Sequence, residues 1–444
     1  MSLRQYPEYK GSRVEWLREV PAHWQTPPLY LRYSADLGKM LDSSRVTGDW
    51  HVPYLRNVDI QWGAINFNDL PEMDIEPSEY GRYTVTAGDL LVCEGGEVGR
   101  AAIVPDVGGI VGYQKALHRL RALTRDEHPA FMYYVMVWAA GYGVFNQSGL
   151  STIAHLTGEQ LRKYRFPKPP LTEQTAIAAF LDRETAKIDA LIAEQEKLIA
   201  LLAEKRQATI SHAVTKGLNP DAPMKDSGVA WLGEVPAHWR VGKIQNFARR
   251  ESGHTPSRQH PEWWENCTIP WFSLADVWQL RTGNVKYVYE TKELVSELGL
   301  ANSSARLLPA GTVMLSRTAS VGYSAIMGCA MATTQDFINW VCKSELAPEF
   351  LLYVLRGMKS EFDRLMMGST HQTIYMPDVA RLMMGLPSPE EQAAIVAFLD
   401  AETSRLDNLT VESTRAIDLL KERRRALISA AVTGKIDVRD TRPM

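Results

Sequence analysis

Apolar residues recur at alternating steps of four and three along two long stretches of the chain, which begin at Glu173 and at Glu391. This spacing is typical of a long helix that packs one side against another helix. Neither stretch contains proline, and glycine occurs only at their ends. The apolar positions that we expect to form the interface of a helix pair are Ile177, Leu181, Ile188, Leu191, Leu198 and Leu202 in the first stretch, and Ile395, Leu399, Leu406, Leu409 and Leu420 in the second.

The two stretches are copies of each other. They align without a gap at an offset of 391 − 173 = 218 residues, and 24 of 45 aligned pairs are identical. Roughly 40 helical residues span roughly 60 Å, so such a helix cannot bury its apolar strip against itself. The partner that the chain offers for each strip is the other copy.

A shorter segment is also duplicated. Nine of eleven residues match between Val14–Trp24 and Val229–Trp239, including a Pro-Ala-His-Trp run. A recurring histidine invites a catalytic interpretation, but no second histidine, cysteine or carboxylate cluster accompanies it. We interpret this segment as a packing element at a domain junction, and its tryptophans as core residues.

Short apolar runs broken by Gly, Pro, Asn and Asp fill the rest of the chain and predict strands and turns. Pro53 parallels Pro270, and Gln114 parallels Gln335, while the residues between such positions diverge. We therefore expect an α+β protein with an internal pseudo-two-fold repeat. The expected divisions are residues 1–24 (first junction), 25–170 (first globular domain), 171–239 (first long helix and second junction), 240–389 (second globular domain) and 390–444 (second long helix).

Composition narrows the class of protein. The chain has 444 residues, of which 45% are hydrophobic, and a formal net charge of −3. Four scattered cysteines without a CxxC pair argue against a zinc site or a disulfide framework, and the beginning lacks a signal peptide. These features predict a cytoplasmic protein that does not enter a membrane. With no GxxxxGK[ST] loop and no methyl-transfer motif in the sequence, we expect no catalytic residue, cofactor or metal.

Polar loops offer side chains suited to DNA, because arginine can fork onto guanine, amides can pair with adenine, and hydroxyls can reach either. Ordinary solvated loops would look the same for any single residue. The candidate DNA-contacting residues are Lys39, Ser43, Ser44, Arg45, Arg56, Gln114, Gln147 and Ser148 in the first globular domain, and His254, Thr255, Ser257, Arg258, Ser316, Arg317, Gln335, His371 and Gln372 in the second.

Several of these segments resemble the specificity subunit of type I restriction–modification systems. The resemblance rests on Pro169–Gln174 and Pro387–Gln392, each followed by Ile-x-x-Phe-Leu-Asp, on Lys225–Pro236, and on Gly253–Arg258, where His254 replaces a glycine of the family's loop. It implies two target-recognition domains separated by two long antiparallel coiled-coil helices, each domain reading half of an asymmetric bipartite target in double-stranded DNA. It also implies docking of two modification (methyltransferase) subunits and of restriction (translocase/nuclease) subunits, with no catalysis by this chain.

Two other functions remain open at this stage. The globular domains of a protein–protein scaffold could bind peptides, and the duplicated helices would serve that role equally well. The chain could also be the recognition subunit of another split methyltransferase or nuclease. Binding to random-sequence duplexes, measured with partner subunits present, distinguishes DNA recognition from peptide binding.

Overall fold

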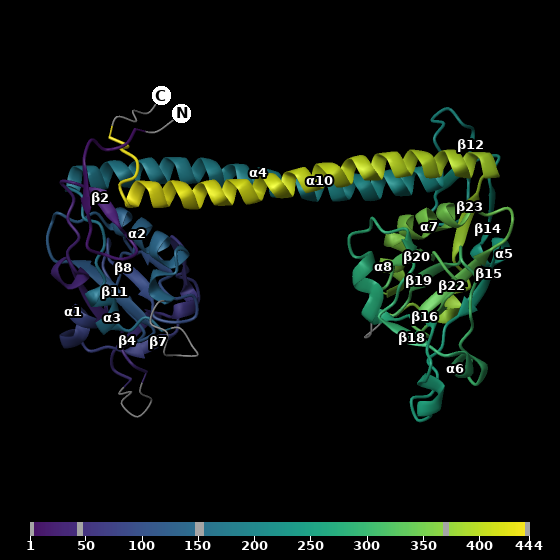
Figure 1. Ribbon diagram of the computed structural model, residues 1–444, viewed down its shortest axis with the longest axis horizontal. Helices are drawn as coiled ribbons and strands as arrows, with labels where there is room; N and C mark the ends of the chain where they lie inside the picture. Colours follow the sequence, from purple (N-terminus) through teal and green to yellow (C-terminus); the bar gives the residue numbers. More distant parts are fainter. Residues whose placement is uncertain (1–3, 42–47, 147–154, 367–372, 440–444) are drawn as a thin grey trace. The chain divides into compact units, whose positions relative to one another are not determined.

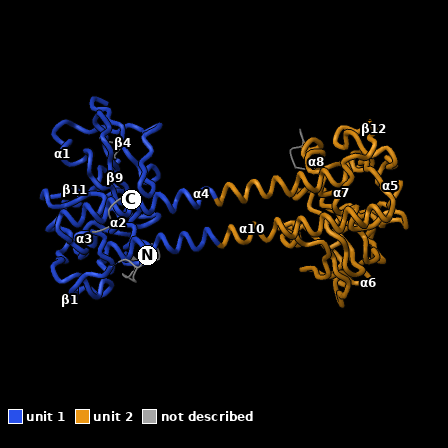
Figure 2. The backbone as a smooth tube through the Cα atoms, turned by 90° about the horizontal axis from the view of Figure 1, so that it is seen from above, with its two compact units in different colours: residues 1–194, 416–444 blue, residues 195–415 orange. Residues whose placement is uncertain are grey.

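The computed structural model describes residues 4–41, 48–146, 155–366 and 373–439. The chain forms two compact units, residues 1–194 with 416–444 and residues 195–415. Each unit contains one globular α+β domain and part of both long helices (Figure 2). The predicted fold class, two similar domains of mixed helix and sheet with two long helices, is confirmed.

The long helices are α4 (Leu171–Lys216) and α10 (Pro389–Val432), and they run antiparallel (Figure 1). In unit 1, Arg424 donates from Nε to the Asp189 carboxylate at 2.9 Å. In unit 2, the counterparts Arg206 and Asp407 approach to 3.3 Å. From the first ion pair to the second, the residue number rises in α4 and falls in α10, as antiparallel helices require. The duplicated ion pair also aligns the two helices in each unit.

Eight of the eleven predicted interface residues are buried or half-buried, and three leucines are exposed. Leu191 and Leu198 are 50% and 39% exposed, and Leu409 is 37% exposed. Burial instead follows Leu181, Thr185, Ile188, Ile192, Gln195, Ile199 and Leu202 in α4, and Leu399, Thr403, Leu406, Thr410, Ser413, Ile417 and Leu420 in α10. From Leu181 onward, the next buried position can lie three or four residues further along the helix. The exposed leucines made both patterns look equally apolar in the sequence.

Unit 1 has a four-stranded antiparallel sheet, in the order β3-β11-β8-β9, and a three-stranded sheet, in the order β10-β4-β7. The helix α2 (Pro129–Gly141) packs against β9. The strands of the two sheets and of the leading hairpin are β1 (Tyr9–Gly11), β2 (Glu19–Pro21), β3 (Tyr33–Leu37), β4 (His51–Leu55), β7 (Glu72–Asp74), β8 (Leu90–Cys93), β9 (Ala101–Ile103), β10 (Gly112–Tyr113) and β11 (Leu117–Ala122).

Unit 2 repeats this plan with one more strand. Its larger sheet has the order β15-β22-β19-β20-β17, its smaller sheet the order β18-β16-β21, and α7 (Pro348–Gly357) packs against β19 and β20. The strands are β12 (Met224–Asp226), β13 (Glu234–Pro236), β14 (Arg240–Lys243), β15 (Ala248–Ser252), β16 (Ile269–Phe272), β17 (Tyr287–Val288), β18 (Glu293–Val295), β19 (Val313–Ser316), β20 (Ser324–Met327), β21 (Ala332–Thr333), β22 (Phe337–Cys342) and β23 (Met383–Leu386).

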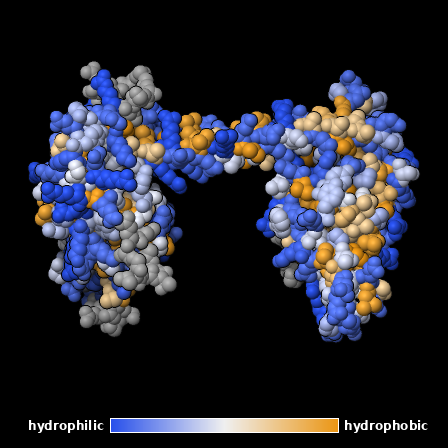
Figure 3. Space-filling model, in the orientation of Figure 1, coloured by the Kyte–Doolittle hydropathy of each residue, from blue (hydrophilic) through white to orange (hydrophobic). Residues whose placement is uncertain are grey.

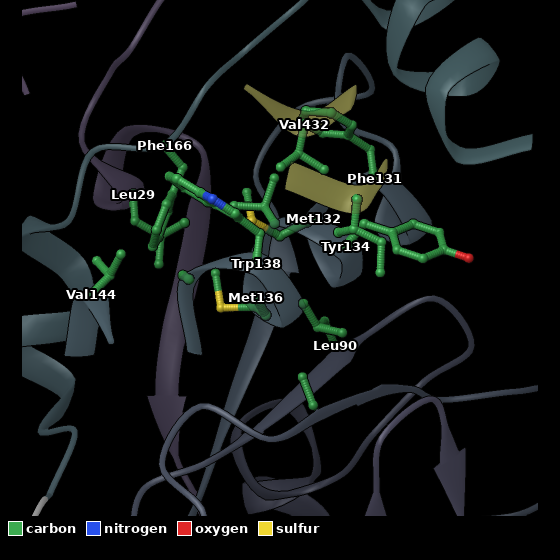
Figure 4. Close-up of a cluster of buried hydrophobic side chains, with 14 of the residues drawn as sticks. Leu29, Leu90, Phe131, Met132, Tyr134, Met136, Trp138, Val144, Phe166 and Val432 are labelled. Atoms are coloured by element: carbon green, nitrogen blue, oxygen red, sulfur yellow. The ribbon is translucent and has the colours of Figure 1, made fainter. Parts of the chain in front are cut away.

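The core of each unit joins its globular domain to the long helices. In unit 1, Phe131 and Trp138 of α2 belong to the same buried cluster as Leu181 of α4 and Val432 of α10 (Figure 4). In unit 2, a cluster of the same kind includes Ile210 of α4, Leu399 of α10 and residues of α7. Burial of apolar surface contributes about 25 cal/mol of stability per Å². Because the cluster is shared, this burial stabilises the helix pair and the globular domain together.

The duplicated junction segment contacts the first turn of each long helix. In unit 1, Trp24 Nε1 donates to Glu173 at 2.9 Å, and His23 Nε2 lies 2.7 Å from the same carboxylate. In unit 2, Trp239 Nε1 donates to Glu391 at 3.0 Å. The tryptophans are fully buried, so the recurring Pro-Ala-His-Trp run is a packing element, as the sequence indicates.

The glutamine after each of these glutamates is fully buried and binds three backbone groups. Gln174 accepts from the His128 N–H at 2.8 Å and donates to the carbonyls of Asp126 and Pro169 at 3.0 and 2.9 Å. Gln392 makes the same three bonds in unit 2, to Ala347, Glu345 and Pro387. One amide in each unit thus joins the start of a long helix to the loop that precedes α2 or α7.

Replacing Gln174 by Leu should lower the free energy of unfolding by about 2–4 kcal/mol, because buried backbone groups lose their partners. Urea unfolding followed by tryptophan fluorescence measures this change. The matched control is Gln61→Leu in the same unit, since Gln61 is exposed and donates one bond to Val58. Equal stability of the two variants would contradict the structural role given to Gln174.

Candidate nucleic-acid interface

A glycine follows the first strand of the large sheet in each unit and lets two backbones approach closely. A Cβ on Gly38 would overlap the carbonyl oxygens of Tyr113 and Gln114, and a Cβ on Gly253 would overlap Thr333 and Thr334. The next residue then pairs with the facing strand end, since Lys39 N–H donates to Tyr113 and His254 N–H donates to Thr333. The side chains that follow each glycine are therefore fixed beside the end of the smaller sheet.

Four of the predicted residues of unit 2 come together at this point. Thr255 Oγ1 donates to Gln335 Oε1 at 2.8 Å, and Arg317 Nε donates to the Gln335 carbonyl at 3.0 Å. The carbonyl of His254 accepts from Trp271 Nε1 at 3.2 Å. The loop after β15, the turn after β21 and the turn after β19 thus form one polar surface.

Arg258, also predicted from the sequence, is held by its neighbours. Its guanidinium lies 3.7 Å from the centre of the Trp264 ring and forms an ion pair with Glu293. Trp264 Nε1 in turn donates to the Ser257 carbonyl at 3.1 Å. The arginine side chain is still 58% exposed, so it is preorganised without being buried.

The two predicted cations of unit 1 that the structure describes are paired with carboxylates. Lys39 forms an ion pair with Glu79, and Arg56 donates from Nε and Nη2 to Asp59, both at 2.8 Å. Burial opposes the charge of Asp59, but the bonds from Arg56 outweigh it and hold the pKa of this carboxyl below its ordinary value. Gln114 lies beside Lys39 through backbone pairing.

A tight turn links β8 to β9 in unit 1 and β19 to β20 in unit 2. Each turn has two left-handed positions, and the first of them is Gly96 in unit 1, with φ of 71°, and Ala319 in unit 2, with φ of 58°. A later segment of the chain packs on each turn through a backbone hydrogen bond. The N–H of Leu156 donates to the carbonyl of Glu94 in unit 1, and the N–H of Ile374 donates to the carbonyl of Arg317 in unit 2. The sequence prediction named Arg317 but missed that Glu94 occupies the same place.

Ser316 is an exception to the predicted surface set. It is fully buried, because both faces of β19 are covered, and its hydroxyl lies 3.3 Å from the Thr318 carbonyl. His254 and Ser257 are exposed. Seven further predictions, Ser43, Ser44, Arg45, Gln147, Ser148, His371 and Gln372, lie outside the described residues.

Sequence reasoning also missed residues that shape these loops. Trp264 and Glu293 position Arg258, and Asn57 joins its loop to the turn by donating to the Gly95 carbonyl at 3.1 Å. The Pro-Glu-Trp-Trp run at residues 261–264 was an available signal, since two adjacent tryptophans beside an arginine-containing loop favour cation–π contacts. Nothing in the sequence pairs Arg258 with Glu293, which is 35 residues away.

Neither a metal site nor a membrane span emerges from the parts of the chain that the structure describes. No group of three or more His, Cys, Asp or Glu side chains is placed to hold a metal ion there. No described helix is long and apolar enough to cross a bilayer.

Comparison with known protein families shows to which family this chain belongs. The model of the type I restriction modification DNA specificity domain matches residues 38–200 and again residues 236–418, well over half of the chain. The chain belongs to this family of DNA specificity domains. Both matches cover a globular domain with part of a long helix, so the family assignment agrees with the duplication.

Curated relatives and a solved structure agree with this family. The MjaIX specificity subunit of Methanocaldococcus jannaschii is 29% identical over 181 residues, 40% of each chain, and the putative MjaX specificity subunit of the same organism is 22% identical over 82% of each. This chain thus spans less than half of the MjaIX subunit. A chain solved in a study of complex assembly and conformational transition of the type I R-M system shares the fold, with 19% identity, a TM-score of 0.66, and coverage of 93% of this chain and 98% of that one.

Replacing Ala319 by Gly should stabilise the protein by about 0.5–1 kcal/mol, because an L-residue is strained at positive φ. Chemical denaturation measures the change. Gly96→Ala in unit 1 is the reciprocal control and should destabilise by a similar amount. The assignment of the left-handed position fails if both substitutions shift stability in the same direction.

Proposed function

We propose that this chain is the DNA specificity subunit of a type I restriction–modification complex and that each unit reads one half of a bipartite, asymmetric target. The observation that carries this proposal is the contrast within the duplication. Glu173 and Gln174 recur with their contacts as Glu391 and Gln392, whereas the loop residues differ between the units. One framework with two different sets of exposed side chains suits two different half-sites.

The surface of unit 2 has the groups that base reading needs. An arginine fork recognises guanine, and an amide recognises adenine, in the major groove. Arg258 and Gln335 are both exposed, and each is already tied to a neighbour. Preorganised side chains lose less conformational entropy on binding, which favours these two as specificity residues.

The long helices are proposed to hold the partner subunits. Leu191, Leu198 and Leu409 leave apolar surface exposed, and the helices show hydrophobic patches in Figure 3. Exposed apolar patches of this kind mark protein–protein contacts. We infer that modification subunits dock there and carry the S-adenosylmethionine chemistry, that restriction subunits join the same complex, and that this chain contributes recognition without catalysis.

Replacing Arg258 by Ala should relax base preference in one half of the target and leave the other half unchanged. Loss of a bidentate base contact costs about 1–3 kcal/mol. Methylome sequencing measures the effect in cells that express the complex with the wild-type or the variant chain.

The control for this variant is Arg240→Ala. Arg240 forms an ion pair with Glu345 and has a side chain 60% exposed, and its guanidinium lies 5.4 Å from the centre of the Phe247 ring. It therefore matches the environment of Arg258 away from the candidate loops. If both halves of the target change with Arg258→Ala, or if Arg240→Ala has the same effect, Arg258 supports the fold and does not read a base.

A selection from random-sequence duplexes tests the function as a whole. The complex of this chain with its modification subunits should enrich two short motifs separated by a fixed gap. A peptide-binding scaffold would enrich no DNA sequence, so failure to select any motif would overturn the proposal.

A further inference from the structure

Unit 2 contains a cavity of about 420 Å³ between α4, α7, the turn before β20, and α8 (Lys359–Met366; Figure 1). Ligand pockets in proteins usually have volumes of about 300–1,000 Å³, so its size suits a small organic molecule. Its wall is partly apolar, with Ile210, Leu280 and Phe362 among the lining residues. None of the residues named above for DNA contact lines it, although part of its wall, from Val321 to Ser324, follows Arg317 along the β19–β20 turn.

The charged residues that line this cavity are four cations and one carboxylate. They comprise Arg206, Arg281, Arg356, Lys359 and Asp363. Asp363 is already 2.7 Å from Lys359, and Arg206 is paired with Asp407 at 3.3 Å. Arg356 has no carboxylate within 4.0 Å among the described residues, and its Nη2 donates to the neutral carbonyl of Val285 at 2.6 Å. The two aspartates that favour the charged form of Arg356, Asp400 and Asp407, are already paired with Lys286 and Arg206.

Placing Arg356 here is unfavourable for the protein alone. Burial, reinforced by the positive charge of Arg206, lowers the pKa of Arg356 to about 10. The hydroxyl of Ser324, which also lines the cavity, is buried and has no hydrogen-bond partner within the described part of the chain. Unsatisfied buried groups of this kind occur at functional sites more often than elsewhere.

The duplication shows that the fold does not need these cations. The helices α2 and α7 align without a gap from Pro129 and Pro348, and Tyr134 and Tyr353 at matching positions both donate to an aspartate of a long helix. On this alignment Val137 stands in place of Arg356, and Ala140 in place of Lys359. Arg356 is therefore an addition specific to unit 2.

We propose that this cavity is a binding site for a small organic phosphate of the nucleoside monophosphate class. The planar forks of Arg356 and Arg206 fit phosphate oxygens and would supply charge-assisted bonds, with the Ser324 hydroxyl as a further donor. The apolar wall would receive the organic part of the ligand. This inference does not rest on the proposed role in DNA recognition.

Isothermal titration of the full-length chain with AMP, adenosine and pyrophosphate tests the site. AMP should bind saturably with one site per chain. Adenosine, which lacks the phosphate, and pyrophosphate, which lacks the organic body, should each bind at least about tenfold more weakly, because each loses one part of the contact. Pyrophosphate binding as tightly as AMP would overturn the organic part of the proposal, and absence of saturable AMP binding would overturn all of it.

The decisive variant is Arg356→Val, which installs the residue of unit 1. It should weaken AMP binding by about tenfold or more, and its melting temperature without ligand should equal or exceed that of the wild type, since a buried cation is removed. Arg364→Val is the control, because Arg364 lies on the same α8 helix as Lys359, pairs with Glu361 and does not line the cavity. Wild-type affinity in Arg356→Val, or equal loss in Arg364→Val, would refute the assignment.

Discussion

The architecture depends on a glutamate and a fully buried glutamine in the first turn of each long helix. Glu173 and Glu391 accept from tryptophans that precede the globular domains, and Gln174 and Gln392 bind the loops before α2 and α7. A carboxylate is also favoured near the amino end of a helix by the helix dipole. These bonds fix where each helix leaves its globular domain, and the apolar strips and interhelical ion pairs then have a defined starting point.

Repetition made most of this fold predictable from the sequence. The helix and the junction segment each occur twice, so each element could be predicted from two different sequences. The structure has a long helix at both predicted stretches. Three of the eleven predicted interface positions were wrong because the helices carry extra leucines on the flank of the buried strip. Leu191 and Ile192 are adjacent and equally apolar, and only packing against a second helix decides that Ile192 is the less exposed of the two.

The candidate site was less predictable, for a physical reason. Composition shows which side chains are suited to DNA, but their availability depends on the partners that folding gives them. Asp59, three residues away, engages Arg56, and Glu79, 40 residues away, engages Lys39. Ser316 is buried because both faces of its strand are covered. His254, Thr255, Arg317 and Gln335 do gather, because Gly253 allows the backbone to pass against Thr333 and Thr334.

The two units present opposite charges on one framework. At the turn between paired strands, unit 1 has Glu94 where unit 2 has Arg317, yet the following chain closes on both by the same backbone bond. Phosphates are negative in every half-site, so a glutamate there gains nothing from the DNA backbone. It can accept from the amino group of cytosine, whereas arginine donates to guanine. A framework held by backbone bonds thus tolerates reversal of charge at its tip, which suits the proposed reading of two different half-sites without a change of fold.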